Sequence, residues 1–600
     1  MISSYDFVII GGGTAGLVVA ARLTEVESIS VLVLEAGGDL ADDPRVKIPI
    51  FYAALLGSEH DWSFRSEPQE GLNGRVIGLN QGKALGGSSA LNAHVFVPPH
   101  GDVIDSWETL GNTGWTWDML KEYSSKSYSS PSIPKDTEKR LAIEHWPASL
   151  KDQAKGPIQT SYGNSEHPIR EAWAKTFRAA QQEMQDNPFV QPSIGSFSSL
   201  ASIDPVTCER SYSASAYYQS AKQRSSLHVL TNAHVEKILF EEGSATSPSK
   251  RAMGVQYMHN GEIKTASVNK EVILAAGVFQ SPKILELSGI GNEELLQRYG
   301  IDVVEDLPGV GENLQDHLIS YTAFEANDSI ETKDALVRQE PEAIGLAMQE
   351  YAATQSGPLA SLGVHTYAYL PLPAKEQADL KTLLGQTCGK GHYARVTEAA
   401  LLDPQQPSAA YLTALGQTNF PLDLADPTKT PAPSAGKFIT FGVMLSRPLS
   451  RGSVHLTSTT ATEPPVIDPK YLSNPIDVEV LARHMLCIKS LAASPAMRPL
   501  LAQPLKFRDP AADFNGDLNA AKAYARANLV SMWHFAGTCA MLPREQKGVL
   551  DARLRVYGVQ GLRVVDASAI PLLSTANLQA TVYAVAERAA DLIKGDWGLE

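Results

Sequence analysis

The run from Tyr5 to Gly16 (Y-D-F-V-I-I-G-G-G-T-A-G) constrains the fold of this chain more than any other stretch. Phe7 to Ile10 is continuously apolar, which is typical of a strand buried on both faces of a parallel sheet. Gly11 permits a tight turn, Gly13 lets the backbone approach a phosphate, and Gly16 lets the next helix pack on the strand. The pattern predicts a strand, a glycine turn and a helix whose N-terminus holds the pyrophosphate of a dinucleotide.

A second apolar strand, Val31 to Leu34, ends in Glu35, which lies 24 positions after Gly11. A carboxylate at this place can accept hydrogen bonds from the hydroxyls of the adenosine ribose, and it repels the 2′-phosphate of NADP. The alternative is an exposed charge at the end of a strand. The strand and its terminal glutamate predict a nucleotide site that disfavours NADP.

The length and charge of the chain limit its organisation and its partners. Six hundred residues exceed one hydrophobic core, because single cores stop growing at about 250–300 residues, so we expect two or more domains. The net charge of −15 argues against a nucleic acid or an anionic membrane as partner and suits a small neutral or cationic ligand. Neither a metal site nor a disulfide framework is expected, because no C-x-x-C motif occurs among the widely spaced Cys208, Cys388, Cys487 and Cys539.

The chain shows no targeting or membrane-spanning signal. The first predicted strand begins at Tyr5, which leaves no room for a secretory leader, and no apolar run reaches the roughly 18 residues that cross a bilayer. The final Gly598-Leu-Glu600 is no peroxisomal signal. We therefore expect a cytoplasmic protein without membrane insertion.

The segment Gln81–Asn92 is rich in small residues and offers little bulk for a core. It suits close passage past a large planar ligand, with exposed N–H groups as donors. The alternative is a flexible surface loop, but the apolar run Val95–Val97 that follows favours a buried position. Glu271–Gly277 is a further apolar strand that ends in small residues, and we expect it to return to the nucleotide-binding sheet.

Elsewhere the patterns are weaker. Helical patches are predicted at Trp117–Tyr123 and Ile169–Met184, with the Ser/Pro-rich Ser124–Pro134 as a candidate lid. After His317 the periodicity loosens, which indicates a second, α+β domain. Alternation predicts a small antiparallel layer and later strands at these ranges: 227–230, 233–240, 254–258, 264–268, 438–445 and 453–456.

The last block carries the candidate chemistry. Ser531-Met-Trp-His534-Phe-Ala-Gly-Thr538 precedes an apolar strand that ends in Asp566. A loop then brings Asn577, and a long helix is predicted from about Gln579 to Lys594. Composition alone does not single out His534, because the chain has 14 histidines. A histidine nevertheless suits the role of base, since its unperturbed pKa of about 6.5 leaves a neutral imidazole near pH 7.

Taken together, these motifs resemble the glucose-methanol-choline (GMC) oxidoreductases. The resemblance extends over nearly the whole chain in the same order, and it is carried by these segments: Gly11–Gly16 with Glu35, Gly82–Asn92, Ser281–Gly291, Gly311–His317, and His534–Thr538 with Asp566. It implies an α/β FAD-binding Rossmann-like domain, with a parallel sheet and a smaller antiparallel layer, plus an α+β substrate domain with an antiparallel sheet. The FAD-binding domain would be discontinuous (1–160, 210–317 and 528–600), and the substrate domain would comprise 161–209 and 318–527.

The resemblance also implies roles for single residues. Gly11, Gly13 and Gly16 would take the pyrophosphate of FAD, Glu35 the adenosine ribose, and His534 would be the catalytic base. Further positions carried over to the cofactor site lie along the isoalloxazine or phosphates (Gly87, Ser88, Asn92), near the adenine (Val235), near the ribityl chain and pyrophosphate (Asp566, Ala567), or elsewhere on its walls (Thr14, Ala15, Ala36, Leu85, Ala93, Ala276, Asn577, Gln579).

Three departures from the family pattern matter. Some members attach FAD covalently through a histidine where this chain has Leu91, so we expect noncovalent FAD. Many members have proline after the catalytic histidine, whereas this chain has Phe535. The second catalytic position is Asn577, as in choline and hydroxymethylfurfural oxidases, while glucose and aryl-alcohol oxidases have histidine and formate oxidase has arginine there.

Alcohol oxidation by a flavin needs removal of a hydroxyl proton and transfer of a hydride to flavin N5. We expect His534 to take the proton and Asn577 to steady the developing alkoxide, although Asn577 also suits a helix N-cap. Phe96, Trp533 and Phe535 are candidates for the substrate pocket, with core packing as the alternative. An aromatic pocket would favour a flat or apolar primary alcohol over a sugar, which needs many hydrogen-bond partners.

The leading hypothesis is an FAD-dependent oxidase or dehydrogenase that acts on an aromatic, furanic or specialised-metabolite alcohol and passes electrons to O₂ or another acceptor. A lyase or cyclase that keeps FAD for structure is the alternative from another class, because fold alone does not fix function. A formate-oxidase-like enzyme is a further alternative. A flavin-binding scaffold without catalysis is disfavoured by His534 and Asn577. The oligomeric state and the choice between oxidase and dehydrogenase stay open.

Overall fold

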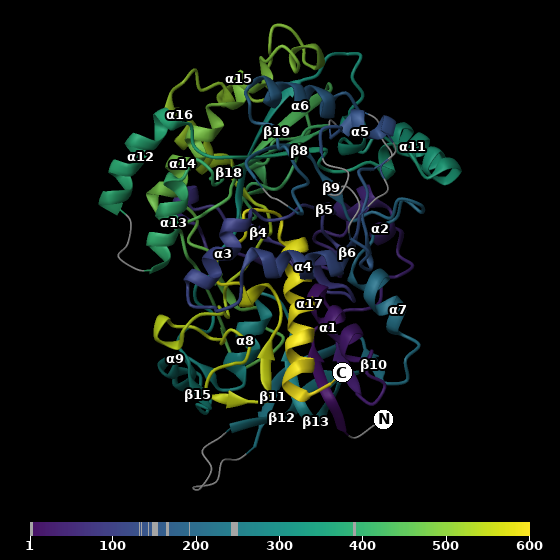
Figure 1. The fold of residues 1–600 in the computed structure, drawn as a ribbon, viewed down its shortest axis with the longest axis vertical. Coiled ribbons are helices and arrows are strands. Elements are labelled where there is room, and N and C mark those ends of the chain that lie inside the picture. The colour runs from purple at the N-terminus through teal and green to yellow at the C-terminus, as the bar shows by residue number, and fades with distance from the viewer. Residues whose placement is uncertain are drawn as a thin grey trace.

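The computed structural model describes residues 4–130, 133, 135–141, 143–146, 154–163, 167–190, 193–241, 250–387 and 392–599. Two large sheets organise the molecule, an eight-stranded sheet in the lower half of Figure 1 and a six-stranded sheet in the upper half. The two chain ends lie near each other at the base of the lower half. This architecture confirms the predicted α/β sheet and the antiparallel sheet of a second unit.

The eight-stranded sheet has the order β10-β2-β1-β13-β12-β11. Its parallel part pairs β1 with β2 and β13, and extends to β10 and β24. Its antiparallel part pairs β11 with β12 and β12 with β13. The strands are β1 (Ser4–Ile10), β2 (Val31–Leu34), β10 (Leu227–Leu230), β11 (Ala233–Phe240), β12 (Lys250–His259), β13 (Glu262–Leu274), β23 (Val559–Gln560) and β24 (Leu562–Val564).

Strand β13 joins the two parts of this sheet and corrects a prediction. The sequence suggested one strand over 264–268 and another from Glu271, whereas the structure forms a single strand from Glu262 to Leu274. Its first half pairs antiparallel with β12, and its second half runs parallel to β1 and β24. The apolar pattern changes along the strand because only the second half is buried on both faces.

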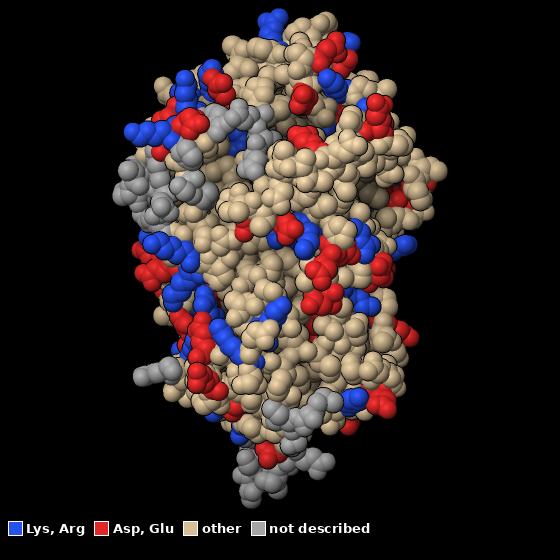
Figure 2. Space-filling view, turned by 90° about the vertical axis from the view of Figure 1, so that its right-hand side faces the viewer, with Lys and Arg blue, Asp and Glu red and all other residues tan. Residues whose placement is uncertain are grey.

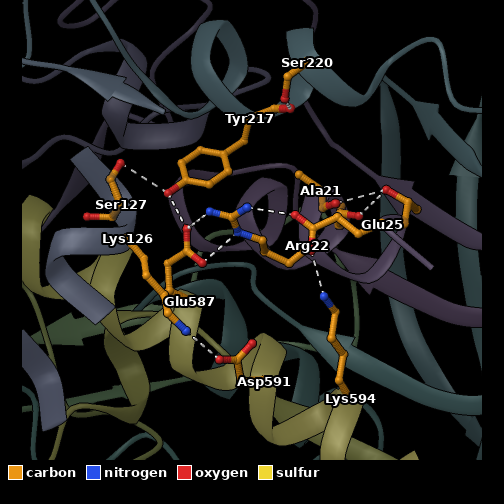
Figure 3. Close-up of polar contacts among 12 residues, drawn as sticks. Ala21, Arg22, Glu25, Lys126, Ser127, Tyr217, Ser220, Glu587, Asp591 and Lys594 are labelled. Atoms are coloured by element: carbon orange, nitrogen blue, oxygen red, sulfur yellow. Dashed lines mark hydrogen bonds and ion pairs between the residues drawn. The ribbon is translucent and has the colours of Figure 1, made fainter. Parts of the chain in front are cut away.

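Helices α1 (Thr14–Leu23) and α17 (Leu578–Trp597) pack together on the sheet, although they lie at opposite ends of the chain. Figure 3 shows the polar contacts that join them. The Arg22 guanidinium donates through Nε and Nη2 to the two carboxylate oxygens of Glu587, each at 2.8 Å. The Tyr217 hydroxyl donates to Glu587 Oε1 at 2.7 Å. The last helix therefore closes the first βα unit through an ion pair in which Glu587 is buried and Arg22 is partly exposed.

The six-stranded sheet is antiparallel, with the order β22-β16-β19-β18-β17-β8. Helices α6 (Ile169–Ala179), α14 (Pro475–Met485) and α16 (Leu518–Asn528) pack against it. The strands are β8 (Gly195–Ser198), β16 (Leu318–Glu325), β17 (Thr366–Leu370), β18 (Ala409–Ala414), β19 (Phe438–Leu445) and β22 (Val530–Ser531). The exact domain boundaries stay a prediction.

Two local predictions need adjustment. Helix α6 ends at Ala179 and does not reach Met184, because Gln181 adopts a left-handed conformation with φ of 56°. The proposed lid Ser124–Pro134 begins as the last turn of α4 (Trp117–Ser127) and continues as β6 (Tyr128–Ser129). Residues 131, 132 and 134 lie outside the described part of the chain.

Shorter elements complete the fold. The other helices are α2 (Pro44–Lys47), η1 (Pro49–Ala54), α3 (Gly101–Thr109), α5 (Lys135–Leu141), η5 (Ala214–Tyr218), α7 (Gln219–Ala221), α8 (Gln280–Leu287), α9 (Glu293–Arg298), α10 (Asp334–Val337), α11 (Pro341–Thr354), α12 (Ala374–Thr387), α13 (His392–Leu402) and α15 (Ile488–Ala492). Short strand pairs include β3 (Phe64–Arg65) with β4 (Gly78–Leu79), β5 (Val95–Phe96) with β9 (Leu200–Ala201), and β20 (Ser453–His455) with β21 (Val466–Asp468).

The surface matches the composition. On the face shown in Figure 2, Lys and Arg side chains lie among Asp and Glu, and neither sign gathers into one large patch. No helix in the described ranges is both long and apolar enough to cross a bilayer.

Candidate active site

A cavity of about 350 Å³ is lined by residues from both large sheets and from the start of α17. Its size lies in the range of small-molecule and cofactor sites. Most residues predicted for the site line this one cavity: Gly11, Gly13, Thr14, Ala15, Glu35, Ala36, Gly87, Ser88, Asn92, Ala93, Val235, Ala276, Trp533, His534, Phe535, Asp566, Ala567, Asn577 and Gln579.

The glycine turn between β1 and α1 has no room for side chains. Gly11 has a φ of 100°, and a Cβ there would lie 2.4 Å from the carbonyl oxygen of Ala275. A Cβ on Gly16 would lie 2.0 Å from the carbonyl oxygen of Gly11. Gly13 is the N-cap of α1 and offers no capping side chain, so the first N–H groups of the helix stay available to an anion at the cavity.

The segment 82–92 forms the facing wall. Gly87 has a φ of 53°, and a Cβ on it would lie 2.8 Å from the Cα of Gly13, so two glycine backbones meet at the cavity. Further along, the Asn92 amide is fixed from both sides. Arg210 Nη1 donates to Asn92 Oδ1 at 2.9 Å, and Asn92 Nδ2 donates to Gln579 Oε1. The segment is an ordered wall and not a flexible loop.

Glu35 is buried, which excludes the alternative of an exposed strand-end charge. Its Oε2 accepts the N–H of Gly12 at 2.8 Å, and its Oε1 accepts the N–H of Gly37 at 2.7 Å. Burial raises the pKa of Glu35 to about 7. Each carboxylate oxygen has a second lone pair, so the side chain can still accept from a ligand hydroxyl.

Asp566 also lines the cavity, just after β24. Its Oδ2 accepts the Ser281 hydroxyl at 2.6 Å and the N–H of Gly277 at 2.9 Å. These bonds tie the end of β24 to the N-terminus of α8, beside the end of β13. Asp566 thereby connects the segment that follows β13 with the segment that follows β24.

His534 follows β22 through a strained turn. Trp533 has a φ of 56°, a left-handed conformation that is rare for a bulky residue and often marks functional sites. The backbone N–H of His534 donates to Asp316 Oδ1 at 2.9 Å, and the Ser531 hydroxyl donates to Asp316 Oδ2 at 2.6 Å. Burial raises the pKa of Asp316 to about 7. Asp316 therefore fixes the backbone that carries His534.

The imidazole of His317 sets the tautomer of His534. His317 Nε2 lies 3.3 Å from the Ser446 carbonyl oxygen, which can only accept, so this nitrogen carries the proton. Burial lowers the pKa of His317 to about 3, so its ring is neutral and its Nδ1 is an acceptor. The Nδ1 atoms of His317 and His534 are 2.9 Å apart, so His534 donates from Nδ1. Its Nε2 then carries the lone pair, and burial lowers the pKa of His534 well below 6.5.

Asn577 precedes the first turn of α17, where the sequence suggested a helix cap. Its side chain makes no capping hydrogen bond. Instead, the Tyr367 hydroxyl on β17 donates to Asn577 Oδ1 at 2.7 Å. Burial raises the pKa of Tyr367, which keeps the phenol protonated. With Oδ1 engaged, the Nδ2 amide group of Asn577 is the donor left for a ligand.

Aromatic side chains form the cavity wall on the side of the six-stranded sheet. The rings of Trp533 and Phe420 pack edge to face, with their centroids 5.2 Å apart. The ring centroids of Phe420 and Tyr321 are 6.1 Å apart. Trp533 Nε1 donates to the Gly78 carbonyl at 3.0 Å, so its polar edge is already paired. Phe535 lines the cavity and packs on Phe279 at 4.6 Å.

Three predicted residues do not line the cavity. Phe96 is fully buried in the core, where its ring stacks on Phe189 at 5.7 Å and packs beside Tyr128, because β5 turns it away from the site. Gly16 lies in the first turn of α1, where it allows the helix to approach Gly11. Leu85 is buried beneath the glycine turn, and its N–H donates to the Gly38 carbonyl.

The sequence did not indicate five residues that shape this site: Asp316, His317, Tyr321, Tyr367 and Phe420. Asp316 and His317 belong to the segment Gly311–His317, which carries part of the family resemblance. The sequence therefore marked these two residues but did not indicate what they do. The other three lie on or beside strands of the six-stranded sheet, where aromatic residues are common and carry no distinct signal.

Comparisons with known proteins cover nearly the whole chain. A GMC oxidoreductase family model matches residues 5–319, and a second one matches residues 448–586. Dehydrogenase citC of Monascus ruber is 35% identical, with 99% of this chain and 96% of the relative covered. An FAD-dependent oxidoreductase structure from Chaetomium thermophilum superposes with a TM-score of 0.86 at 28% identity, covering 99% of this chain and 100% of that one.

Two further structures resemble the chain over its full length. A formate oxidase has a TM-score of 0.83 at 27% identity and covers 100% of this chain and 99% of its own. A fungal aryl-alcohol oxidase has a TM-score of 0.82 at 27% identity and covers 100% of both chains.

Proposed function

The chain belongs to the GMC oxidoreductase family and is an FAD-dependent oxidoreductase, and from this premise we propose that it oxidises a neutral primary alcohol to the aldehyde. The observation that carries the proposal is the pairing of His534 with His317, which leaves a neutral imidazole with its Nε2 lone pair at the cavity. In this reaction FAD accepts a hydride from the alcohol carbon at flavin N5.

The residues of the cavity fit a bound FAD. The uncapped start of α1 suits a diphosphate, because its first N–H groups have no capping side chain, and the facing glycine backbones leave room for the ligand. Glu35 would accept from the ribose hydroxyls. We propose noncovalent binding because the apolar Leu91 lines the cavity at the position where some relatives attach FAD through histidine.

Two side chains would handle the alcohol. His534 Nε2 would take the hydroxyl proton, and the fixed Nδ1–H bond to His317 keeps the ring oriented for that transfer. Asn577 Nδ2 would donate to the same oxygen as negative charge develops on it, which lowers the barrier without reorganisation. The proton then resides on His534 until the aldehyde leaves.

The walls of the cavity favour an uncharged, flat substrate. Among the described lining residues, Lys283 is the only lysine or arginine. Its ammonium donates to the backbone carbonyls of Ala461 and Glu463, beside His234 near the predicted adenine end. A carboxylate such as formate would find no cation beside His534, so an aromatic or furanic alcohol fits better than formate.

Anaerobic addition of alcohols to the purified flavoprotein tests the proposal. We expect a primary aromatic alcohol to bleach the oxidised flavin absorbance, and we expect His534→Ala to slow this bleaching by about 10²-fold or more with FAD still bound. Absence of bleaching across a broad alcohol panel would favour the alternative, a lyase or cyclase that keeps FAD for structure. Comparing peroxide formation with dye reduction for one good substrate decides whether O₂ or another acceptor takes the electrons.

A further inference from the structure

Two phenol hydroxyls reach the same cavity without a strong hydrogen-bond acceptor. Tyr321 lies on β16, and its hydroxyl contacts Met532 Sδ at 3.6 Å. A thioether sulfur is only a weak acceptor. Tyr52 lies on η1, and its hydroxyl has no hydrogen-bond partner within the part of the chain that the structure describes. Both residues line the cavity, and neither belongs to the predicted catalytic pair of His534 and Asn577.

The phenols of Tyr52 and Tyr321 lie near each other in the cavity wall. Burial raises the pKa of Tyr321, and the nearby Tyr52 phenol raises it further. Burial also raises the pKa of Tyr52. Both groups therefore stay protonated at any physiological pH, and each keeps an O–H to donate. Two neighbouring neutral donors suit an uncharged oxygen acceptor.

Two other polar groups near this side of the cavity already have partners. Trp533 Nε1 donates to Gly78, and the Tyr367 hydroxyl donates to Asn577. Tyr321 itself packs in an apolar cluster with Leu412, Val364 and Phe420. A donor that faces an apolar surface costs free energy unless a ligand or water accepts from it. Tyr52 and Tyr321 are thus donors that a substrate can satisfy.

We propose that Tyr52 and Tyr321 form a specificity site for a hydrogen-bond acceptor on the substrate, separate from the carbinol that His534 and Asn577 engage. The inference rests on the proposed alcohol oxidation and narrows its substrate class. The preferred substrate is a neutral, flat alcohol with a carbonyl, lactone or ring oxygen at its far end. The same alcohol with an alkyl group at that end would leave both phenols without an acceptor.

A matched pair of substrates tests this proposal on the FAD-loaded enzyme. 4-Acetylbenzyl alcohol and 4-isopropylbenzyl alcohol have nearly the same shape, and only the first has a distal acceptor. For the acetyl compound, we expect the second-order rate constant of flavin reduction to fall by about tenfold or more in the Tyr52→Phe/Tyr321→Phe double variant. For the isopropyl compound we expect a change below about twofold. The comparison of variants cancels the electronic effect of the acetyl group, because that effect is the same in both proteins.

Tyr557→Phe is the matched control, since the Tyr557 hydroxyl donates to the Leu542 carbonyl and the residue is not among those lining the cavity. We expect it to leave both substrates unchanged. Equal losses for the two substrates in the double variant, or no loss for either, would overturn the specificity site.

A binding measurement separates failure of this inference from failure of the proposed function. 4-Methylacetophenone and 4-isopropyltoluene lack the carbinol and cannot be oxidised there. Titration of the oxidised flavin spectrum with each should show tighter binding of the ketone, and the double variant should lose that preference. If no alcohol reduces the flavin while the ketone preference holds, the proposed function fails and the phenol site stands. If alcohols reduce the flavin and the wild type shows no ketone preference, the site is wrong and the function stands.

Discussion

Two polar side chains of the α17 region, Glu587 and Asn577, differ in how completely the protein satisfies their hydrogen bonds. Near its middle, Glu587 is buried and receives donors from Arg22 and Tyr217 (Figure 3). At its start, Asn577 is held by a single phenol, and its amide nitrogen faces a cavity. The first group is fully paired within the protein, whereas the second keeps one donor for a ligand.

The contrast separates groups that hold the fold from groups that we propose to take part in the reaction. A buried charge is retained only when partners satisfy it, so the Arg22–Glu587 pair ties together segments from both chain ends. The two predicted catalytic side chains are neutral, and each is fixed from behind by one partner. His534 has His317, and Asn577 has Tyr367. The partner orients the group and leaves its working atom unpaired.

The largest expected effect is on stability. Arg22→Met leaves the Glu587 carboxylate buried without its cation, and we expect it to lower the free energy of unfolding by about 3–5 kcal/mol. Thermal unfolding monitored by circular dichroism would measure the loss. Lys594→Ala is a control on the same helix, because Lys594 pairs with the more exposed Glu25, and such pairs contribute about 0–1 kcal/mol.

The double variant Arg22→Met/Glu587→Met sharpens this test. It removes both charges, and we expect it to regain most of the stability lost by the single change, because a buried ion pair can often be replaced by apolar side chains. Anaerobic bleaching should persist in every variant that folds and binds FAD. A single variant as stable as the wild type would show that the pair does not hold the two chain ends.

A second effect concerns a histidine paired for structure. His455 on β20 contacts Glu286 at 2.7 Å and Glu312 at 3.3 Å. Burial lowers its pKa, but the two carboxylates outweigh burial and raise the pKa to about 9. A raised histidine pKa stabilises the fold fully below the unfolded value of about 6.5, and this stabilisation is lost as the pH rises through 9.

We therefore expect about 2–3 kcal/mol of stability to disappear between pH 6.5 and 9.5 in the wild type, measured by urea unfolding across that range. His455→Gln should flatten this part of the profile, because the titrating group is gone. An unchanged slope in the variant would assign the pH dependence to other groups.

The smallest expected effect is on orientation. His317→Ala removes the acceptor that fixes His534 Nδ1–H, and we expect anaerobic flavin reduction to slow by about tenfold, or about 1.4 kcal/mol. His317→Gln retains an oxygen that can accept, and it should restore much of the rate. The pH profile of reduction should shift in the alanine variant, since the His534 pKa depends on this neighbour. Equal rates in all three proteins would mean that His317 only fills space.

Sequence patterns predicted the elements that carry the candidate cofactor residues, and the roles of those residues stay a prediction. The glycine turn, the position of Glu35 and the apolar strands dictate local geometry that any such chain must adopt, so β1, α1 and β2 appear close to their expected bounds. His534 and Asn577 also line one cavity, as expected from their motifs.

The substrate half of the site could not be predicted in the same way. Tyr321 and Phe420 line the same cavity as His534, and Tyr367 reaches Asn577, because the six-stranded sheet brings together β16, β17 and the segment after β18. The spacing of these three residues in the sequence does not indicate that they lie at one site. Phe96 shows the reverse case, because its motif suggested the pocket and the local strand pairing turned it into the core.

Anaerobic reduction of the bound flavin by 4-acetylbenzyl alcohol, followed by its absorbance in wild type and His534→Ala, tests the central claim most directly. The account predicts complete bleaching in the wild type and bleaching that is slower by about 10²-fold or more in the variant, with equal FAD content in both. Bleaching at the same rate in both proteins would contradict the assignment of His534 as the base.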